Sequence, residues 1–337
     1  TGGKALLTID SATGKAPVNF GDISVGGLGG STVTISADSE VLGRADEATL
    51  QVGLIGYDRT IATSAEYPAD APGKSVSTQT WNPVGGASVL TNAGQIGHDG
   101  GAGYTGTAAQ VWVESVTTAT ATNSGSIFGS IGVNALSEKQ GVETVSTNLD
   151  DVTQITTTTT TYTPVGGTAS LLNSRLITGD ASIAGATGTL TNNGVIRGSV
   201  HAGQSVSNHV TQSVDTVSQI GEDELLSVNP LFNQTYTVNQ NALLGGAVKV
   251  DGAFVGIEDA NGDPVKTSNI VATVNLNPGS VTVGGVHAGF DEETGERFTA
   301  TRVNLVDNGW LGLNDDGVDT LKTAFATYDP AIRAAKD

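Results

Sequence analysis

Acidic loops are the first residues whose types and spacing could do chemistry. Runs of Asp and Glu lie beside Gly, Asn or Thr at 150–151, 222–224, 291–293 and 315–316. Loops rich in oxygen can hold Ca²⁺, a hard cation that takes six to eight oxygen ligands. The loop at 312–319 is not an EF-hand, because Gly312 stands where the first ligand would be. We expect no cofactor, with bound calcium as the alternative, and the candidate ligands for that alternative are Asp315, Asp316 and Asp319.

The histidines and tryptophans give little support to catalysis. The same phrase, Val-His-Ala-Gly, surrounds both His201 and His287, which favours a repeated structural position over a single catalytic base. The chain has no cysteine and no Gly-x-Ser-x-Gly nucleophile elbow. Its three tryptophans, Trp81, Trp112 and Trp310, are scattered along the sequence, whereas sugar-cleaving clefts group their aromatic rings. We therefore expect that the protein is not an enzyme.

The composition limits the partners and the location. A formal net charge of -19 repels phosphate backbones and anionic lipids, so nucleic acid is not an expected partner. No run approaches the ~18 apolar residues of a membrane-spanning helix. Methionine is absent throughout, including at position 1. The simplest interpretation is a processed chain that is secreted and lies outside the cell or at its surface.

The elements that must position these residues are strands. Short runs rich in Val, Ile and Thr alternate with turn-forming Gly, Asn, Asp and Ser, and 46 of the 337 residues are glycine. The exception is residues 318–337, where Leu321 and Phe325 lie four apart, as in a short amphipathic helix. We predict an all-β, Gly/Thr/Val-rich repetitive protein, a β-solenoid or a series of β-sandwiches, with a short C-terminal helix.

Internal repeats divide the chain. The sequence from Asn82 aligns with the sequence from Thr163, that from Thr122 with Thr191, and that from Asp150 with Asp215. The order is preserved while the offset drifts, as duplication followed by loop insertions and deletions would leave it. We predict an N-terminal β region at 1–80, two related copies at 81–161 and 162–240, a C-terminal β region at 241–306 and a helical tail at 307–337.

A smaller unit lies within the copies and consists of Asn, one residue, Gly, one residue, Ile and a further Gly. It is seen at Asn92 and Gly94, at Asn123 and Gly125, and at Asn192 and Gly194, with a degraded form at Asn173. Because Asn and Gly tolerate a positive φ, each unit is expected to be a tight turn followed by a strand.

These units resemble the repeats of secreted β-solenoid adhesins, namely autotransporter passenger domains and filamentous-haemagglutinin-like proteins. The resemblance implies stacked coils with the Asn-Gly units at their corners. The intervals between the units are irregular, however, so that β-sandwiches in series stay open as an alternative.

The leading functional hypothesis is a structural subunit of a self-assembling extracellular filament or cell-surface layer. Its candidate assembly strand, which would add to a sheet edge of a neighbouring copy, consists of Lys4, Ala5, Leu6, Leu7, Thr8 and Ile9. The alternative for these residues is the first strand of their own domain.

The alternative function is a monomeric secreted adhesin or carbohydrate-binding passenger domain, with glycans or a host surface as its partner. A β-helical polysaccharide-degrading enzyme and a phage tail-type tube protein are less favoured.

Overall fold

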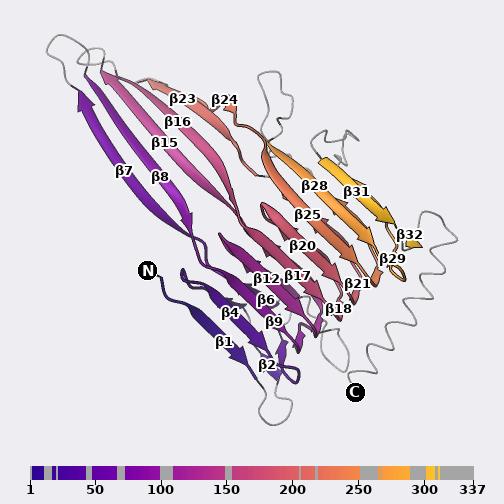
Figure 1. Ribbon diagram of the computed structural model, residues 1–337. Helices are drawn as coiled ribbons and strands as arrows, with labels where there is room; N and C mark the ends of the chain where they lie inside the picture. Colours follow the sequence, from indigo (N-terminus) through magenta and orange to yellow (C-terminus); the bar gives the residue numbers. More distant parts are fainter. Residues whose placement is uncertain are drawn as a thin grey trace.

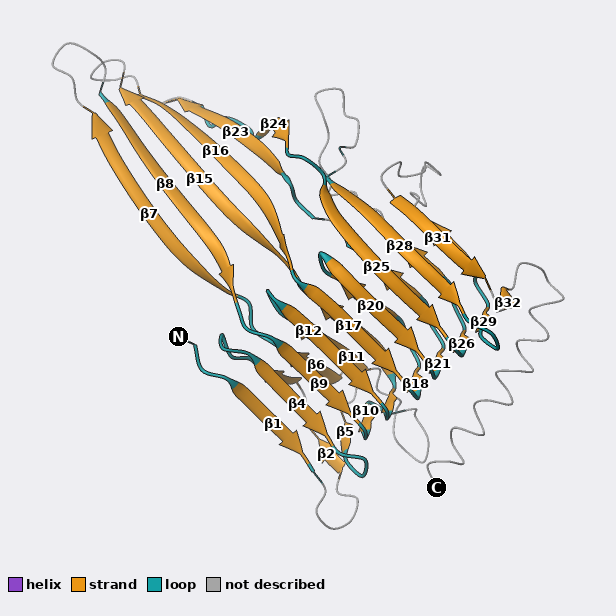
Figure 2. Ribbon diagram, viewed as in Figure 1, coloured by secondary structure: helices purple, strands orange, loops and turns teal. Residues whose placement is uncertain are grey.

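The computed structural model describes residues 2–10, 17–19, 22–42, 48–66, 73–98, 109–148, 154–204, 206–216, 219–250, 265, 267–288, 301–307 and 310–311. These residues form stacked coils in which each turn of the chain adds one strand to each of three parallel sheets (Figures 1 and 2). The predicted all-β class is confirmed, and the parallel pairing of successive coils is that of a β-solenoid. The predicted C-terminal helix lies outside the described residues.

The three solenoid sheets contain nine, nine and eight strands in the described part of the chain. Sheet A consists of β1 (Ala5–Ile9), β4 (Ser31–Ile35), β9 (Ser88–Asn92), β12 (Thr118–Asn123), β17 (Thr168–Asn173), β20 (Thr187–Asn192), β25 (Phe232–Gln240), β28 (Ser268–Leu276) and β31 (Thr301–Asp307). Sheet B consists of β2 (Pro17–Asn19), β5 (Glu40–Leu42), β10 (Gln95–Ile96), β13 (Ser126–Ile127), β18 (Leu176–Ile177), β21 (Val195–Ile196), β26 (Leu243–Leu244), β29 (Val281–Thr282) and β32 (Trp310–Leu311). Sheet C consists of β3 (Asp22–Val25), β6 (Ala48–Val52), β11 (Ala109–Glu114), β14 (Gly129–Asn134), β19 (Ala181–Ala184), β22 (Val200–Ala202), β27 (Val248–Val250) and β30 (Val286–Ala288).

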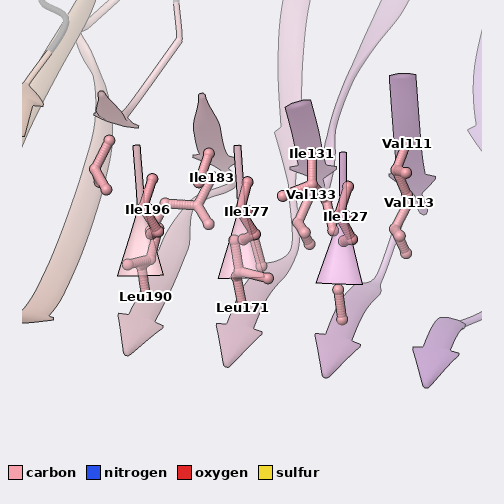
Figure 3. Packing of buried hydrophobic residues seen from close by; sticks show 14 of the residues in the cluster. Val111, Val113, Ile127, Ile131, Val133, Leu171, Ile177, Ile183, Leu190 and Ile196 are labelled. Carbon is pink, nitrogen blue, oxygen red and sulfur yellow. The ribbon is translucent and has the colours of Figure 1, made fainter. Parts of the chain in front are cut away.

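Alternation of side chains builds the core. In β17, Ala169 and Leu171 are buried whereas Ser170 and Leu172 are half-buried on the outer face, as the two-residue period of a strand requires. Equivalent positions of successive coils pair in register, so that Leu171 lies opposite Leu190. The result is one continuous core of Val, Ile, Leu and Ala along the solenoid axis (Figure 3). Small and β-branched side chains are enough to fill this core, because each coil packs only against the coils directly above and below it.

In the described part of the chain three hairpins leave the solenoid, after the second, fourth and sixth coils. They connect a strand of sheet C to the next strand of sheet A and stack beside one another in the order of the coils (Figure 1). Together they form a six-stranded antiparallel sheet, here called the hairpin sheet. Its strands are β7 (Gly56–Glu66), β8 (Lys74–Val84), β15 (Leu136–Asn148), β16 (Gln154–Gly166), β23 (His209–Thr216) and β24 (Glu224–Val228).

The hairpins explain the irregular repeat intervals in the sequence. The coil from Asn173 to Asn192 is bare and takes 19 residues, whereas the coil from Asn123 to Asn173 contains β15 and β16 and takes 50. The segments 81–161 and 162–240 each contain two coils and then the strands of a hairpin, and the second segment also contains β25 of the next coil. The division of the chain at these boundaries remains our proposal.

Candidate functional site

The candidate assembly strand lies at one end of the solenoid. Residues 5–9 form β1, which pairs in parallel with β4 of the same chain, and Lys4 precedes the strand and is exposed. Within the described residues, β1 is the edge strand of sheet A. Leu6 is 74% exposed, and Leu7 faces the core but is only partly buried. The structure therefore places these residues in the first coil of their own chain, with one strand edge open.

The repeat turns lie at the corner between sheets A and B. Asn92, Asn123 and Asn192 each end a strand of sheet A and are buried, as is Asn173 of the degraded unit. Their amides form a hydrogen-bonded ladder along the axis, in which each Nδ2 donates over 2.8 Å to the next Oδ1, from Asn92 through Asn123 and Asn173 to Asn192.

The amide ladder has defined ends. Asn192 Nδ2 donates to Gln240 Oε1 over 3.1 Å, and the next position in register is Leu276. At the other end, Asn92 Oδ1 has no hydrogen-bond partner among the described residues, because the equivalent position of the preceding coil is Ile35. The ladder stabilises the corners from within and exposes no side chain for catalysis, since all five amides are buried.

The corner glycines differ from the expectation. A positive φ is not recorded at Gly94, Gly125 or Gly194, and the left-handed conformation is found instead at Gly97, the last residue of the first unit. The reason for glycine at the corners is close stacking. A Cβ on Gly125 would lie 1.9 Å from the carbonyl oxygen of Gly94 in the preceding coil.

The candidate calcium ligands Asp315, Asp316 and Asp319 lie outside the described residues. Among the residues that the structure does describe, no three His, Asp or Glu side chains are grouped to hold a metal ion.

Two of the four histidines occupy equivalent positions. His201 of β22 and His287 of β30 lie in one row on the outer face of sheet C, with Lys249 of β27 between them. The repeated phrase thus corresponds to the same place in two coils. His201 is half-buried, and His287 Nε2 lies 2.7 Å from the carbonyl oxygen of Gly284.

His209 belongs to a row of side chains across the base of the hairpin sheet. Pairing places Arg59, Trp81, Gln140 and Tyr162 side by side, and the ring of Tyr162 stacks on His209 at 4.6 Å. The Arg59 guanidinium lies 5.5 Å from the centre of the Trp81 ring, within the range of a cation–π interaction. Burial lowers the pKa of His209, because the charged ring would lose hydration there.

Glu138 of β15 lies near the same row. Loss of hydration raises the pKa of its carboxyl group, and a hydrogen bond from Ser207 opposes this change in part. Beside the same junction, residues that include Thr161, Asn208 and Phe232 line an open cavity of about 500 Å³. The row and this cavity are where the hairpin sheet meets the solenoid.

Sequence reasoning missed a groove on the outer face of sheet C. Trp112 of β11 is 43% exposed, and its six-membered ring lies over Gly132 of β14, where a Cβ would approach the ring to 2.4 Å. Together with residues that include Asp180, Ser182 and His201, it lines a cavity of about 240 Å³. The groove crosses β11, β14, β19 and β22, which are four successive coils.

Side-chain oxygens are held in order along one rim of this groove. The backbone N–H of Asp180 donates to Ser130 Oγ over 3.0 Å, and the N–H of Ser199 donates to Asp180 Oδ1 over 2.7 Å. The backbone of each coil therefore fixes an acceptor of the preceding coil. In sequence, Trp112 and Asp180 are 68 residues apart, so no local motif could have indicated the groove.

In the described part of the chain no helix is long and apolar enough to cross a membrane. Neither a protein-family model, nor a curated protein, nor a solved structure was found to match the chain.

Proposed function

We propose that the chain is a non-catalytic, secreted scaffold of the adhesin type, in which the solenoid carries the hairpin sheet as a surface for contact with another cell or matrix. The observation that carries this proposal is the recurrence of a hairpin after the second, fourth and sixth coils. Each hairpin adds a pair of strands, yet none of the hairpin strands contributes a residue to the continuous core.

The burial of the hairpin strands supports a role outside folding. Solenoid strands alternate buried and half-buried residues, whereas β8 and most of β16 are half-buried at nearly every position. A single-layer sheet with two accessible faces has no core of its own, and sheets ordinarily need one covered face for stability. Exposed apolar side chains on the hairpin sheet include Tyr57, Ile61 and Leu226, and exposed apolar surface of this kind is a mark of interaction sites.

A bead-adhesion assay tests the proposal. The residues between Asn134 and Thr168, which include β15 and β16, are replaced by Gly-Ala, the connection that the chain itself uses between Ala184 and Thr187. Beads are coated with the protein, and the number that adheres is measured on epithelial monolayers, on mucin and on plant cell-wall polysaccharide. We expect the parent protein to adhere to one of these surfaces and the variant to lose adhesion, because its hairpin sheet is interrupted.

A matched control keeps the strands. An Asn-Gly turn between Asn148 and Gln154 shortens the tip of the same hairpin and leaves its strand pairing in place. The variant without β15 and β16 must keep its β circular-dichroism signal. If it still adheres, the hairpin sheet is not the contact surface. Absence of adhesion by the parent protein would count against the adhesin function.

A second candidate is end-to-end assembly into a filament or layer, and the first coil favours it. Leu7, Ile23 and Val25 contact the core but are only partly buried, and in the described residues β1 and β7 are edge strands of two sheets. A second copy stacked on this end could continue both sheets by strand addition.

Negative-stain microscopy and sedimentation test this second candidate. We expect polymers that become shorter in Leu7→Lys, because a charge would enter the joint, while the outward-facing Thr8→Lys keeps them. Normal polymers after deletion of residues 1–10 would contradict strand addition through β1. A stable monomer at high protein concentration would contradict assembly as such.

A further inference from the structure

We infer that the groove on sheet C lined by Trp112, Gly132, Asp180, Ser182 and His201 is a binding site for a neutral sugar ring of a surface glycan. This inference rests on the proposed adhesin function, since it names a chemical class of partner. It concerns a different surface, because the hairpin sheet and the outer face of sheet C belong to separate sheets.

The aromatic wall is the first element of the site. The Trp112 indole packs over Gly132 and yet remains 43% exposed on the outer face of a regular sheet, so that part of the ring is accessible to a ligand. At the position equivalent to Trp112, the adjoining coils have Gln51, Gly132 and Ser182, so the ring is an addition to the coil pattern and not part of it. Aromatic faces pack well against the C–H faces of sugar rings, which are apolar although their edges carry hydroxyl groups.

The floor of the groove is the row of residues that follows Trp112 across sheet C, and it leaves space for the Trp112 indole. Gly132 has no side chain, and the Trp112 ring occupies the space above it that a Cβ would fill. Next in register is Ser182, with a small hydroxyl group, followed by His201 on the far side. With strands about 4.8 Å apart, the distance from β11 to β22 is roughly 14 Å. The indole covers Gly132, so the floor is low at Ser182, between the indole and His201.

The rim provides directional hydrogen bonding. Asp180 is exposed and its Oδ1 is already fixed by the backbone N–H of Ser199, which orients the carboxylate without filling all of its acceptor sites. Gln110 on the same rim is exposed and carries an amide that can both donate and accept. Sugar hydroxyl groups donate and accept as well, so these groups match them.

Size and charge select the class of ligand. The cavity of about 240 Å³ is smaller than the roughly 300–1,000 Å³ of sites for drug-sized ligands, and suits one ring of a longer chain. The Asp180 carboxylate and the net charge of -19 disfavour a uronic or sialic acid. A neutral hexose or N-acetylhexosamine remains.

Titration with methyl glycosides tests the inference. The probes are the methyl glycosides of glucose, galactose, mannose, N-acetylglucosamine and glucuronic acid, followed by saturation-transfer-difference NMR and calorimetry. We expect millimolar binding of at least one neutral glycoside, as is usual for a single ring on an open site. Trp112→Ala should weaken it at least tenfold, and Gly132→Ala several-fold, because a Cβ there displaces the ring without removing it.

The control is Leu172→Ala, which removes an apolar side chain from the outer face of sheet A and should leave the binding unchanged. Thermal melts establish that each variant is folded, and Asp180→Asn provides a second, milder change on the rim. Failure of every neutral glycoside to bind would overturn the inference, as would unchanged binding in folded Trp112→Ala or preferential binding of the glucuronide. Adhesion through the hairpin sheet could still be observed in any of these cases, so that the two proposals fail separately.

Discussion

Asn173 illustrates how a single polar side chain is accommodated in an otherwise apolar interior. Its Nδ2 donates to Asn192 Oδ1 over 2.8 Å and to the carbonyl oxygen of Val195 over 3.3 Å, and its Oδ1 accepts from Asn123 over 2.8 Å. Every buried amide in the middle of the ladder thus depends on its two neighbours, which makes the ladder a device for keeping the coils in register.

Replacement of Asn173 by Ala should destabilise the solenoid strongly. The change removes the hydrogen bonds of Asn173 with Asn123, Asn192 and the carbonyl oxygen of Val195. Asn123 Nδ2 keeps its bond to the carbonyl oxygen of Leu176, and Asn192 Oδ1 keeps its bond from the N–H of Gly194. Each lost bond contributes about 0.5–1.5 kcal/mol, and the shorter side chain also leaves a small cavity. We expect the free energy of unfolding in urea to fall by roughly 2–4 kcal/mol. Ser170→Ala, on the outer face of the same strand, is the control and should change little. If Asn173→Ala lowers the free energy of unfolding no more than Ser170→Ala does, the ladder does not stabilise the solenoid.

Glu138 gives a prediction on pH. Because its folded-state pKa is raised above the usual value of 4.5, the fold prefers the protonated carboxyl. The favourable contribution is complete below pH 4.5 and is lost as the pH rises through the raised pKa. Glu138→Gln should therefore be more stable than the parent at pH 7, by less than ~1 kcal/mol because the site is partly hydrated, and equally stable at pH 4.

The control for this prediction is Glu143→Gln, an exposed carboxylate of the same strand. It removes the same net charge without relieving burial. Thermal melts at both pH values measure the difference between the two variants, and an equal gain in both would assign the effect to overall charge.

At the scale of elements, the hairpin sheet and the solenoid sheets differ in what covers them. The strands of the hairpin sheet hydrogen-bond to their neighbours but lie in one layer, whereas strands of sheet A such as β17 and β20 have a buried inner face. Regions with few buried apolar contacts open at lower free energy than the core.

Hydrogen exchange should reveal this difference. We expect amides of β8, β15 and β16 to exchange faster than those of β17 and β20, measured by mass spectrometry on peptides from each strand. Equal protection in the two regions would mean that a second layer covers the hairpin sheet in solution. Repetition of the measurement over a range of protein concentrations would then distinguish a second copy from a feature of the single chain.

The sequence predicted those elements whose information is local. The Asn-Gly-Ile corners and the alternating strands, such as β4 and β28, were recognisable because their turn formers and two-residue period lie within ten residues. The antiparallel pairing of β16 with β23 was not, because a run of threonines has no apolar face to specify a partner. The groove beside Trp112 depends on register across coils, and the residues that become neighbours there are separated in sequence by connections of very different lengths.

For the whole molecule, repulsion between like charges is the main electrostatic term that opposes folding. The chain has a net charge of -19, and like charges in a folded chain repel one another more than in an extended one. Salt screens this repulsion over a Debye length of about 10 Å at 0.1 M. A protein held together by an apolar core and backbone ladders should therefore gain stability when salt is added.

Unfolding in urea at increasing sodium chloride concentration measures this effect. We expect the unfolding midpoint to rise between low and moderate ionic strength, and potassium chloride to act equally. A rise that calcium chloride produces at far lower concentration would indicate a bound cation instead of general screening, and a fall in stability with salt would contradict the repulsion argument.

The corner between sheets C and A has a consequence for protein engineering. It is closed by two residues, Gly185 and Ala186, between β19 and β20, yet the same corner accommodates all of β15 and β16 one coil earlier without a change in register. Loop length at this corner is thus uncoupled from coil stacking. Foreign peptides grafted there would be displayed at a regular spacing on a rigid rod, and the natural hairpins already demonstrate how large such a graft can be.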